Sequence, residues 1–187
     1  SCWNQAEGKA FTFRSKDGLD IEKLASIKDK FGSIDKDKAA AFGYEILDGD
    51  AWIAEDVDIL IPAALENQIT PAVFPKISKQ VKIICEAANG PTTPDCDELI
   101  KAAGITLIPD FLCNAGGVTC SYFEQVQCNM NYFWTKEEVS EKLKTAMVKA
   151  FKAVYDLAQS ENMYMRDAAY TISVKRVAEA VKLRGWC

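Results

Sequence analysis

Three polar strings carry side chains suited to binding a flat polar ligand, and each directly follows a short apolar run. The strings are PAALEN (62–67), EAANGPTTP (86–94) and PDFLCNAGGV (109–118). Each contains an asparagine, Asn67, Asn89 or Asn114, whose amide offers both a donor and an acceptor to another amide or to a ribose hydroxyl. Small neighbouring residues would let such a ligand approach the backbone. Tight-turn chemistry, which also uses Asn, Gly and Pro, is the alternative for each asparagine taken alone.

Two hydroxyl side chains, Thr119 and Ser121, follow Gly116 and Gly117. A hydroxyl at this position can hold a carboxylate with the help of nearby backbone N–H groups. The alternative is a helix cap or a solvated serine, and composition alone favours that alternative.

Absent residues and motifs exclude several classes of mechanism. The 187 residues include no histidine, which excludes Ser-His-Asp triads, Cys-His dyads and His-ligated zinc. Neither G-x-G-x-x-G nor a Walker motif is present, so the sequence contains no recognisable phosphate-binding loop. The net charge of −5 argues against non-specific binding to nucleic acid or to a membrane surface. No run of about 18 apolar residues occurs, so no transmembrane helix is expected.

The seven cysteines contain no C-x-x-C pair, so nothing in the sequence supports a zinc ribbon or a thioredoxin-like motif. Several cysteines lie within apolar runs, where a free cysteine behaves as a small buried hydrophobic residue. We therefore predict free thiols, a reducing compartment and a cytoplasmic location. The sequence begins with Ser1 and lacks a signal-peptide pattern, and we expect it to be part of a longer polypeptide.

The elements that must position the polar strings follow a strand–helix–strand pattern. Three short β-branched runs are the strand candidates: 57–61, 81–85 and 105–108. Such runs fit strands of a parallel sheet that is buried on both faces. Residues 66–79 are expected to be loosely helical, and 93–103 to form a helix that Thr93 caps and Gly104 ends. The pattern predicts an α/β fold with a βαβ unit.

The N-terminal third is predicted less completely. A short strand is expected at 10–13, and a helix at 21–31 that Gly32 ends. Residues 33–55 are charged and receive no element.

Beyond residue 110 the sequence is mainly helical, with a mixed segment at 118–133. Thr135 and Glu138 form a capping box for a long amphipathic helix that reaches about Leu157. Its core face is predicted to include three apolar residues: Met147, Phe151 and Val154. A final helix is expected at 166–183.

At its polar strings the sequence resembles the C-terminal part of glutamate dehydrogenases, in the family of glutamate, leucine, phenylalanine and valine dehydrogenases. Six strings carry the resemblance: VDILIPAALENQIT (57–70), EAANGPTTP (86–94), PDFLCNAGGVTCSYFE (109–124), FWTKEEV (133–139), MRDAAY (165–170) and KLRGW (182–186). The resemblance covers nearly the whole chain and is weakest at 1–55. It implies an α/β fold: a partial Rossmann-like parallel sheet with C-terminal helices. Residues 1–130 would form a partial dinucleotide-binding domain, and residues 131–187 a C-terminal helical segment.

The resemblance also implies an activity, which is the reversible oxidative deamination of L-glutamate to 2-oxoglutarate and ammonia with NAD or NADP. The implied cofactor-binding residues are Ala63, Ala64, Asn89 and Asn114. Ser121 would bind the side-chain carboxylate of the substrate, and Val118 would lie in the same substrate site. The protein would be a homo-oligomer, as members of the family form hexamers.

Two departures from the family pattern limit what the chain could do alone. The catalytic lysine and aspartate of the family belong to an N-terminal substrate domain that this sequence lacks, and the glycine-rich phosphate loop is absent too. Ser1 to Asn4 matches the end of the second strand of the cofactor domain, where an acidic residue often binds the ribose. This chain offers Cys2 and Asn4 there, which leaves NAD and NADP both open. A non-catalytic nucleotide-binding or regulatory module derived from the same fold is the alternative.

Overall fold

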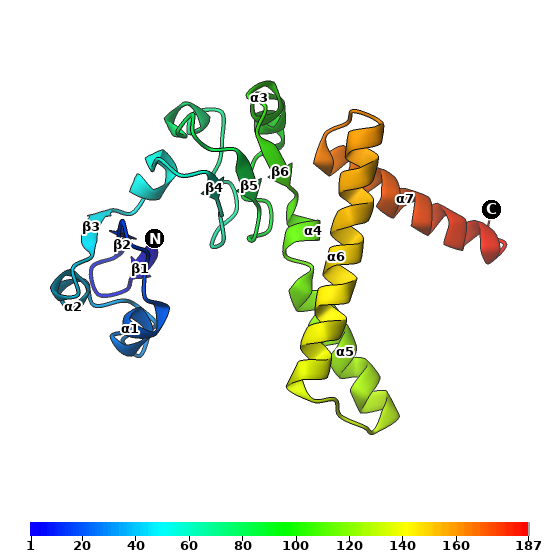
Figure 1. Cartoon of the computed structure of the whole chain (residues 1–187), viewed down its shortest axis with the longest axis horizontal. Helices are drawn as coiled ribbons and strands as arrows, with labels where there is room; N and C mark the ends of the chain where they lie inside the picture. Colours follow the sequence, from blue (N-terminus) through cyan, green and yellow to red (C-terminus); the bar gives the residue numbers. More distant parts are fainter. Residues whose placement is uncertain (187) are drawn as a thin grey trace. The chain divides into compact units, whose positions relative to one another are not determined.

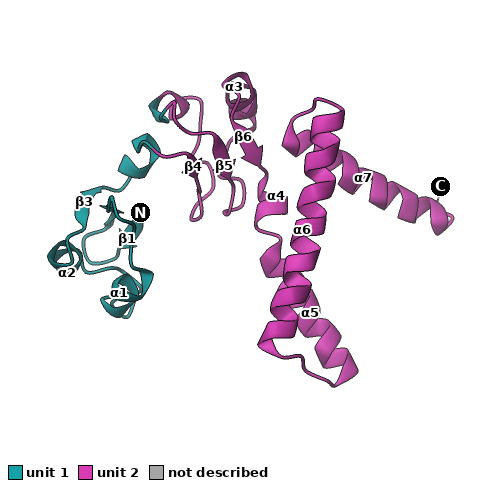
Figure 2. Cartoon of the chain, viewed as in Figure 1, with its two compact units in different colours: residues 1–56, 76–78 teal, residues 57–75, 79–187 magenta. Residues whose placement is uncertain are grey.

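The chain divides into two compact units in the computed structural model, which describes residues 1–186. Unit 1 contains residues 1–56 and 76–78, and unit 2 contains residues 57–75 and the chain from residue 79 onward (Figure 1, Figure 2). Among the described residues, no helix is both long enough and apolar enough to cross a membrane.

An antiparallel sheet and short helices make up the regular structure of unit 1. The elements are β1 (Cys2–Asn4), β2 (Lys9–Arg14), α1 (Ile21–Ser26), α2 (Lys36–Ala41), β3 (Glu45–Asp48) and a 3₁₀ helix (Ala51–Ala54). Strand β2 lies between β1 and β3. Its inward-facing Phe11 and Phe13 pack with Leu24, Ile34 and Ala39 in a buried cluster. The strand predicted at 10–13 is therefore confirmed, whereas β1, β3 and α2 were not predicted.

Helix α1 ends at Ser26, so the prediction that it continues to Phe31 is wrong. The carboxylate of Asp29 accepts hydrogen bonds from the backbone N–H groups of Phe31 (2.8 Å) and Ser33 (2.9 Å). This side-chain turn replaces the helical hydrogen-bond ladder, as short aspartates often do. Gly32, which was expected to end the helix, instead lies within the turn at a φ of +83°.

Three parallel strands form the sheet of unit 2, which confirms the predicted α/β class. They are β4 (Ile59–Leu60), β5 (Ile83–Cys85) and β6 (Thr106–Ile108), in the order β4-β5-β6 (Figure 1). This is the strand order in the second half of a Rossmann sheet. Leu60, Ile84 and Leu107 are buried. Ile59 is 51% exposed, so burial on both faces does not hold for β4, which pairs only with β5 among the described residues.

The connection from β4 to β5 contains no α-helix, so the loosely helical prediction for 66–79 is wrong. Two prolines interrupt this segment, and only a short 3₁₀ helix forms (Phe74–Lys76). Its first part runs beside the loop that follows β5. The N–H of Ile69 donates to the carbonyl of Pro91 (2.8 Å), and the N–H of Thr93 donates to the carbonyl of Ile69 (3.0 Å). These bonds continue the parallel pairing past the ends of the strands.

The remaining elements of unit 2 are helical. They are a 3₁₀ helix (Pro94–Cys96), α3 (Asp97–Ala102), α4 (Asp110–Cys113), α5 (Gly116–Met130), α6 (Lys136–Ser160) and α7 (Met165–Leu183). The predicted capping box of α6 is present: Thr135 Oγ1 accepts from the N–H of Glu138 (3.2 Å), and Glu138 Oε2 accepts from the N–H of Thr135 (2.7 Å). The segment predicted to be mixed is the regular helix α5, which ends at Asn131 in the left-handed conformation.

Helices α4, α6 and α7 share one apolar core. Its buried residues are Leu112, Val154, Ala158, Met165, Ala168 and Ala169. Of the three α6 residues predicted to lie in the core, Val154 is buried, Met147 is partly buried and Phe151 remains 36% exposed. The apolar stripe of α6 is therefore only partly covered within this chain.

Candidate functional site

The three polar strings meet at the carboxyl edge of the parallel sheet. The backbone N–H groups of Ala87 (3.1 Å) and Ala88 (2.9 Å) donate to the carbonyl of Pro62, which joins the string after β4 to the string after β5. The N–H of Glu86 donates to the carbonyl of Ile108 (3.1 Å), which joins the string after β5 to the string after β6. Open α/β sheets bind their ligands at this edge.

Asn89 and Asn114 are brought into direct contact there. The side-chain amino group of Asn114 donates to Oδ1 of Asn89 at 2.6 Å. Asn89 is exposed in the loop after β5, and Asn114 is the partly buried residue that ends α4. With this bond made, the amino group of Asn89 can still donate hydrogen bonds and the side-chain oxygen of Asn114 can still accept them. That arrangement is complementary to a carboxamide or to a ribose hydroxyl.

Ala63 and Ala64 lie in the loop directly after β4, and both are exposed. Their methyl side chains leave the adjacent backbone open to a flat ligand. Asn67, in the same string, has a left-handed φ of +55°, and its N–H donates to the carbonyl of Gly90 (2.9 Å). Turn chemistry therefore accounts for Asn67 without a ligand.

Val118 and Ser121 lie on the first half of α5, and both are exposed. Their spacing of three residues places them on the same face of the helix. Helix α5 begins at Gly116, so Ser121 lies inside the helix and is not its cap. Thr119 differs, because its hydroxyl donates to the carbonyl of Ala115 (2.8 Å) within the same helix. Ser121 is the more accessible hydroxyl at this position.

A buried ion cluster adjoins this edge, and sequence reasoning missed it. Arg166, in the first turn of α7, contacts Glu86 (Nη2–Oε1 2.8 Å), Asp97 (Nε–Oδ2 3.0 Å) and Asp110 (Nη1–Oδ1 3.5 Å). The side chain of Glu86 is fully buried, and that of Arg166 is 15% exposed. The hydroxyl of Tyr164 donates to Asp97 (3.0 Å). The available signal was Glu86 itself, because a carboxylate placed directly after a buried strand requires a buried partner.

The protonation states within this cluster follow from burial and from opposite charges. Burial lowers the pKa of Arg166, but the hydrogen bonds and charges of Glu86 and Asp97 outweigh it and hold the pKa above its usual value. Burial raises the pKa of Tyr164, and the charge of Asp97 and the hydrogen bond to it raise that pKa further. Arg166 is therefore a permanent cation, and Tyr164 remains a neutral donor to Asp97.

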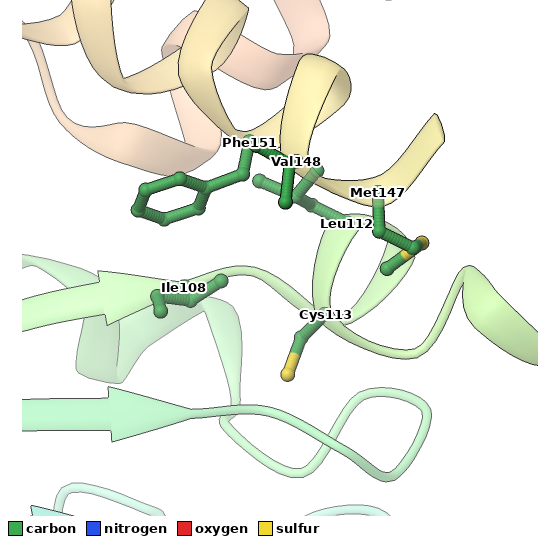
Figure 3. A pocket seen from close by; sticks show the side chains of 6 residues that line it. All are labelled: Ile108, Leu112, Cys113, Met147, Val148 and Phe151. Atoms are coloured by element: carbon green, nitrogen blue, oxygen red, sulfur yellow. The ribbon is translucent and has the colours of Figure 1, made fainter. Parts of the chain in front are cut away.

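An apolar hollow of about 220 Å³ lies beside Cys113, the residue before Asn114 (Figure 3). Its lining comes from β6, α4 and α6: Ile108, Leu112, Cys113, Met147, Val148 and Phe151. Burial raises the pKa of the Cys113 thiol, which keeps this group protonated near neutral pH. The hollow therefore suits apolar packing, whereas the groups able to bind a polar ligand are at the ends of the strands.

Six cysteines lie among the described residues, and all six are free thiols, as predicted. Cys187 lies outside the described residues. Cys96 is fully buried, and burial together with the charges of Asp95 and Asp97 raises its pKa to about 11. Within residues 1–186, no group of three or more Cys, Asp or Glu side chains is arranged to hold a metal ion.

The chain is similar in sequence to known dehydrogenases. The family described as Glutamate/Leucine/Phenylalanine/Valine dehydrogenase matches residues 10–185. The NAD-specific glutamate dehydrogenase of Clostridioides difficile is 47% identical over 184 residues, which are 98% of this chain and 42% of that protein. The corresponding enzyme of Staphylococcus aureus (strain COL) is 45% identical over 169 residues, or 90% of this chain and 39% of that protein. This chain thus spans about two fifths of the length of these relatives.

Solved structures agree with the sequence relatives. A glutamate dehydrogenase from Peptoniphilus asaccharolyticus matches at a TM-score of 0.65 and 42% identity, over 83% of this chain and 36% of that one. A hetero-hexameric glutamate dehydrogenase from Thermus thermophilus matches at a TM-score of 0.75 and 25% identity, over 91% of this chain and 38% of that one. The fold is thus shared with enzymes that extend well beyond the length of this chain.

Proposed function

The chain belongs to the Glutamate/Leucine/Phenylalanine/Valine dehydrogenase family, and from that premise we propose that it is part of an NAD-dependent glutamate dehydrogenase. Such an enzyme converts L-glutamate reversibly to 2-oxoglutarate and ammonia. Residues 1–130 would contribute to the dinucleotide-binding domain, and residues 131–187 would form its C-terminal helical segment. The names of the relatives from C. difficile and S. aureus, both NAD-specific glutamate dehydrogenases, support the substrate and favour NAD over NADP.

The observation that carries the proposal is the Asn89–Asn114 pair at the carboxyl edge of the sheet. Its remaining donor and acceptor match the carboxamide of a nicotinamide ring or an adjacent ribose hydroxyl. The exposed Ala63 and Ala64 place no bulky side chain in the way of a planar ring. The residues present therefore fit the nicotinamide half of NAD, and these four residues would hold it.

The chemistry that NAD supplies when bound is acceptance of a hydride from the substrate Cα, after which water hydrolyses the resulting imine. The role of this chain would be to orient the reactants. The asparagine pair would fix the ring, and Ser121 would donate a hydrogen bond to the side-chain carboxylate of glutamate, with Val118 beside it. No lysine among the described residues is buried, so the acid–base group would come from elsewhere in the enzyme.

We also propose that the parent protein is a homo-oligomer in a reducing, cytoplasmic compartment. Val174 and Val177, three residues apart on α7, are 63% and 65% exposed, which supports a contact with another part of the assembly. The six free thiols support a reducing environment.

The test uses the full-length protein that contains this chain. We expect it to reduce NAD when L-glutamate is supplied and to form NADH more slowly with L-leucine. With NADP in place of NAD, the rate should fall. No glutamate-dependent reduction of either dinucleotide, despite tight binding of one of them, would instead support the non-catalytic module.

Ser121→Val in the full-length protein should lower the preference for glutamate over an aliphatic amino acid. A charged carboxylate would lose a hydroxyl donor, and such bonds contribute roughly 1.5–3 kcal/mol, which is about tenfold or more in selectivity. The measurement is the ratio of kcat/KM for glutamate to that for norvaline. Thr119→Val is the matched control, because the Thr119 hydroxyl is bound within α5. An unchanged ratio in Ser121→Val would show that Ser121 does not bind the carboxylate.

A further inference from the structure

The Arg166 cluster is connected to the asparagine pair through the backbone. One oxygen of Glu86 binds Arg166, and the other, Oε2, accepts from the N–H of Asp110 (2.9 Å). One oxygen of Asp110 contacts Arg166, and the other, Oδ2, accepts from the N–H of Gly90 (2.9 Å). Each carboxylate thus joins the guanidinium to a loop at the sheet edge.

The segments that these carboxylates hold, which are the loop after β5 and helix α4, carry the two asparagines. Gly90 directly follows Asn89 in the sequence. Asn114 donates its backbone N–H to the carbonyl of Asp110 (2.8 Å). Asp110 is therefore hydrogen-bonded both to Asn114 and to Gly90, the neighbour of Asn89. The position of Asp110 in turn depends on its contacts with Glu86 and Arg166.

We propose that Arg166 is a positioning residue for the Asn89–Asn114 pair, and so for the nicotinamide contact that the proposed function assigns to the pair. The cluster places three carboxylates around one guanidinium. Without the cation these carboxylates repel each other in a poorly solvated site, and Asp110 loses the partner that holds it against Gly90. The geometry also requires an arginine, because the planar fork contacts all three carboxylates, whereas a lysine ammonium is a single point charge on a flexible stem.

The first test is Arg166→Lys in the full-length protein, with NADH binding followed by fluorescence. We expect the Kd for NADH to rise about fivefold, as for the loss of one hydrogen bond between neutral groups. In steady-state assays the KM for NAD should rise while the KM for glutamate stays within about twofold, because Ser121 lies on a different element. Arg176→Lys, at an exposed position on the same helix, is the control and should change neither constant.

The second test separates positioning from stability. Asn114→Ala alone should weaken NADH binding, and adding Arg166→Lys to it should weaken binding little further, because both changes disable the same pair. Hydrogen exchange of the segment 86–94 should become several-fold faster in Arg166→Lys even without ligand, which is measured independently of any enzymatic activity. If Arg166→Lys does not fold, Asp110→Asn takes its place with the same expectations.

The proposal is overturned if a folded Arg166→Lys or Asp110→Asn protein binds NADH as the wild type does. It is also overturned if the losses from Arg166→Lys and Asn114→Ala multiply fully, since independent effects mean that Arg166 does not act through the pair. A different result would overturn the proposed function alone: wild-type protein that binds NADH but reduces NAD with no amino acid. A wild-type protein that binds no nicotinamide dinucleotide would overturn both.

Discussion

The isolated segment 1–187 is expected to show no measurable reduction of NAD or NADP by L-glutamate. Its sequence contains no G-x-G-x-x-G loop to hold the pyrophosphate, and all its described lysines are exposed or only partly buried. Lys36 is the partly buried one, and its ammonium is paired with Glu7 at 2.8 Å in unit 1. None of the described lysines is therefore a buried candidate for the acid–base group.

The measurement is formation of NADH by purified segment, with the full-length protein assayed in parallel. We expect the segment to form no NADH, whereas a full-length protein with one misplaced contact would still form NADH at a reduced rate. A segment that turns over at about 1 per second or more, a rate within the normal enzymatic range, would show that the missing groups are not required.

The second large effect concerns the stability of the same segment when it is purified alone. We expect it to associate in dilute solution, or to melt below about 55 °C, near the middle of the range for mesophilic domains. Strand β4 has two residues and pairs on one side only within the described chain, and Ile59 and Ile61 are 51% and 56% exposed. In a Rossmann sheet the first strand lies beside the fourth, at the position of this open edge.

An open edge leaves backbone N–H and C=O groups unpaired and available to another chain. The lost pairing and apolar cover can match the total stability of a domain, about 5–15 kcal/mol. Analytical ultracentrifugation combined with thermal melting provides the measurement. A dilute monomer that melts cooperatively above about 55 °C would contradict the prediction, whereas restoring the upstream residues of the parent protein should raise the melting temperature.

The sequence predicted the elements whose signal is local. The runs that became β4, β5 and β6 are short, apolar and rich in β-branched residues, and the Thr135–Glu138 box marks the start of α6 on its own. The charged strand β3 (Glu45–Asp48) was missed, because its place in the sheet is decided by pairing with β2, more than 30 residues earlier. In 66–79, two prolines and the pairing of Asn67 and Ile69 with the loop after β5 together take the place of helix formation.

The candidate site shows the same division. Asn89 and Asn114 could be singled out because each follows a strand, and their contact follows from the parallel topology. The cluster around Arg166 could not be predicted in this way, since its members lie on four separate segments and no spacing relates them. The string MRDAAY (165–170) resembles a family motif, but no neighbouring residue in the sequence indicates that its Arg166 has three carboxylate partners.

The separation of Arg166 from its partners also fixes the order in which the site can form during synthesis. Glu86 and Asp110 precede Arg166 by 80 and 56 residues. At 5–20 residues per second, the ribosome adds Arg166 about 3–16 s after these carboxylates. Until then the carboxylates have no cation to gather them, and the segments at the sheet edge are held only by the hydrogen bonds among themselves. A nascent chain that stalls before α7 would therefore contain both Asn89 and Asn114 but lack Arg166, the residue proposed to position them.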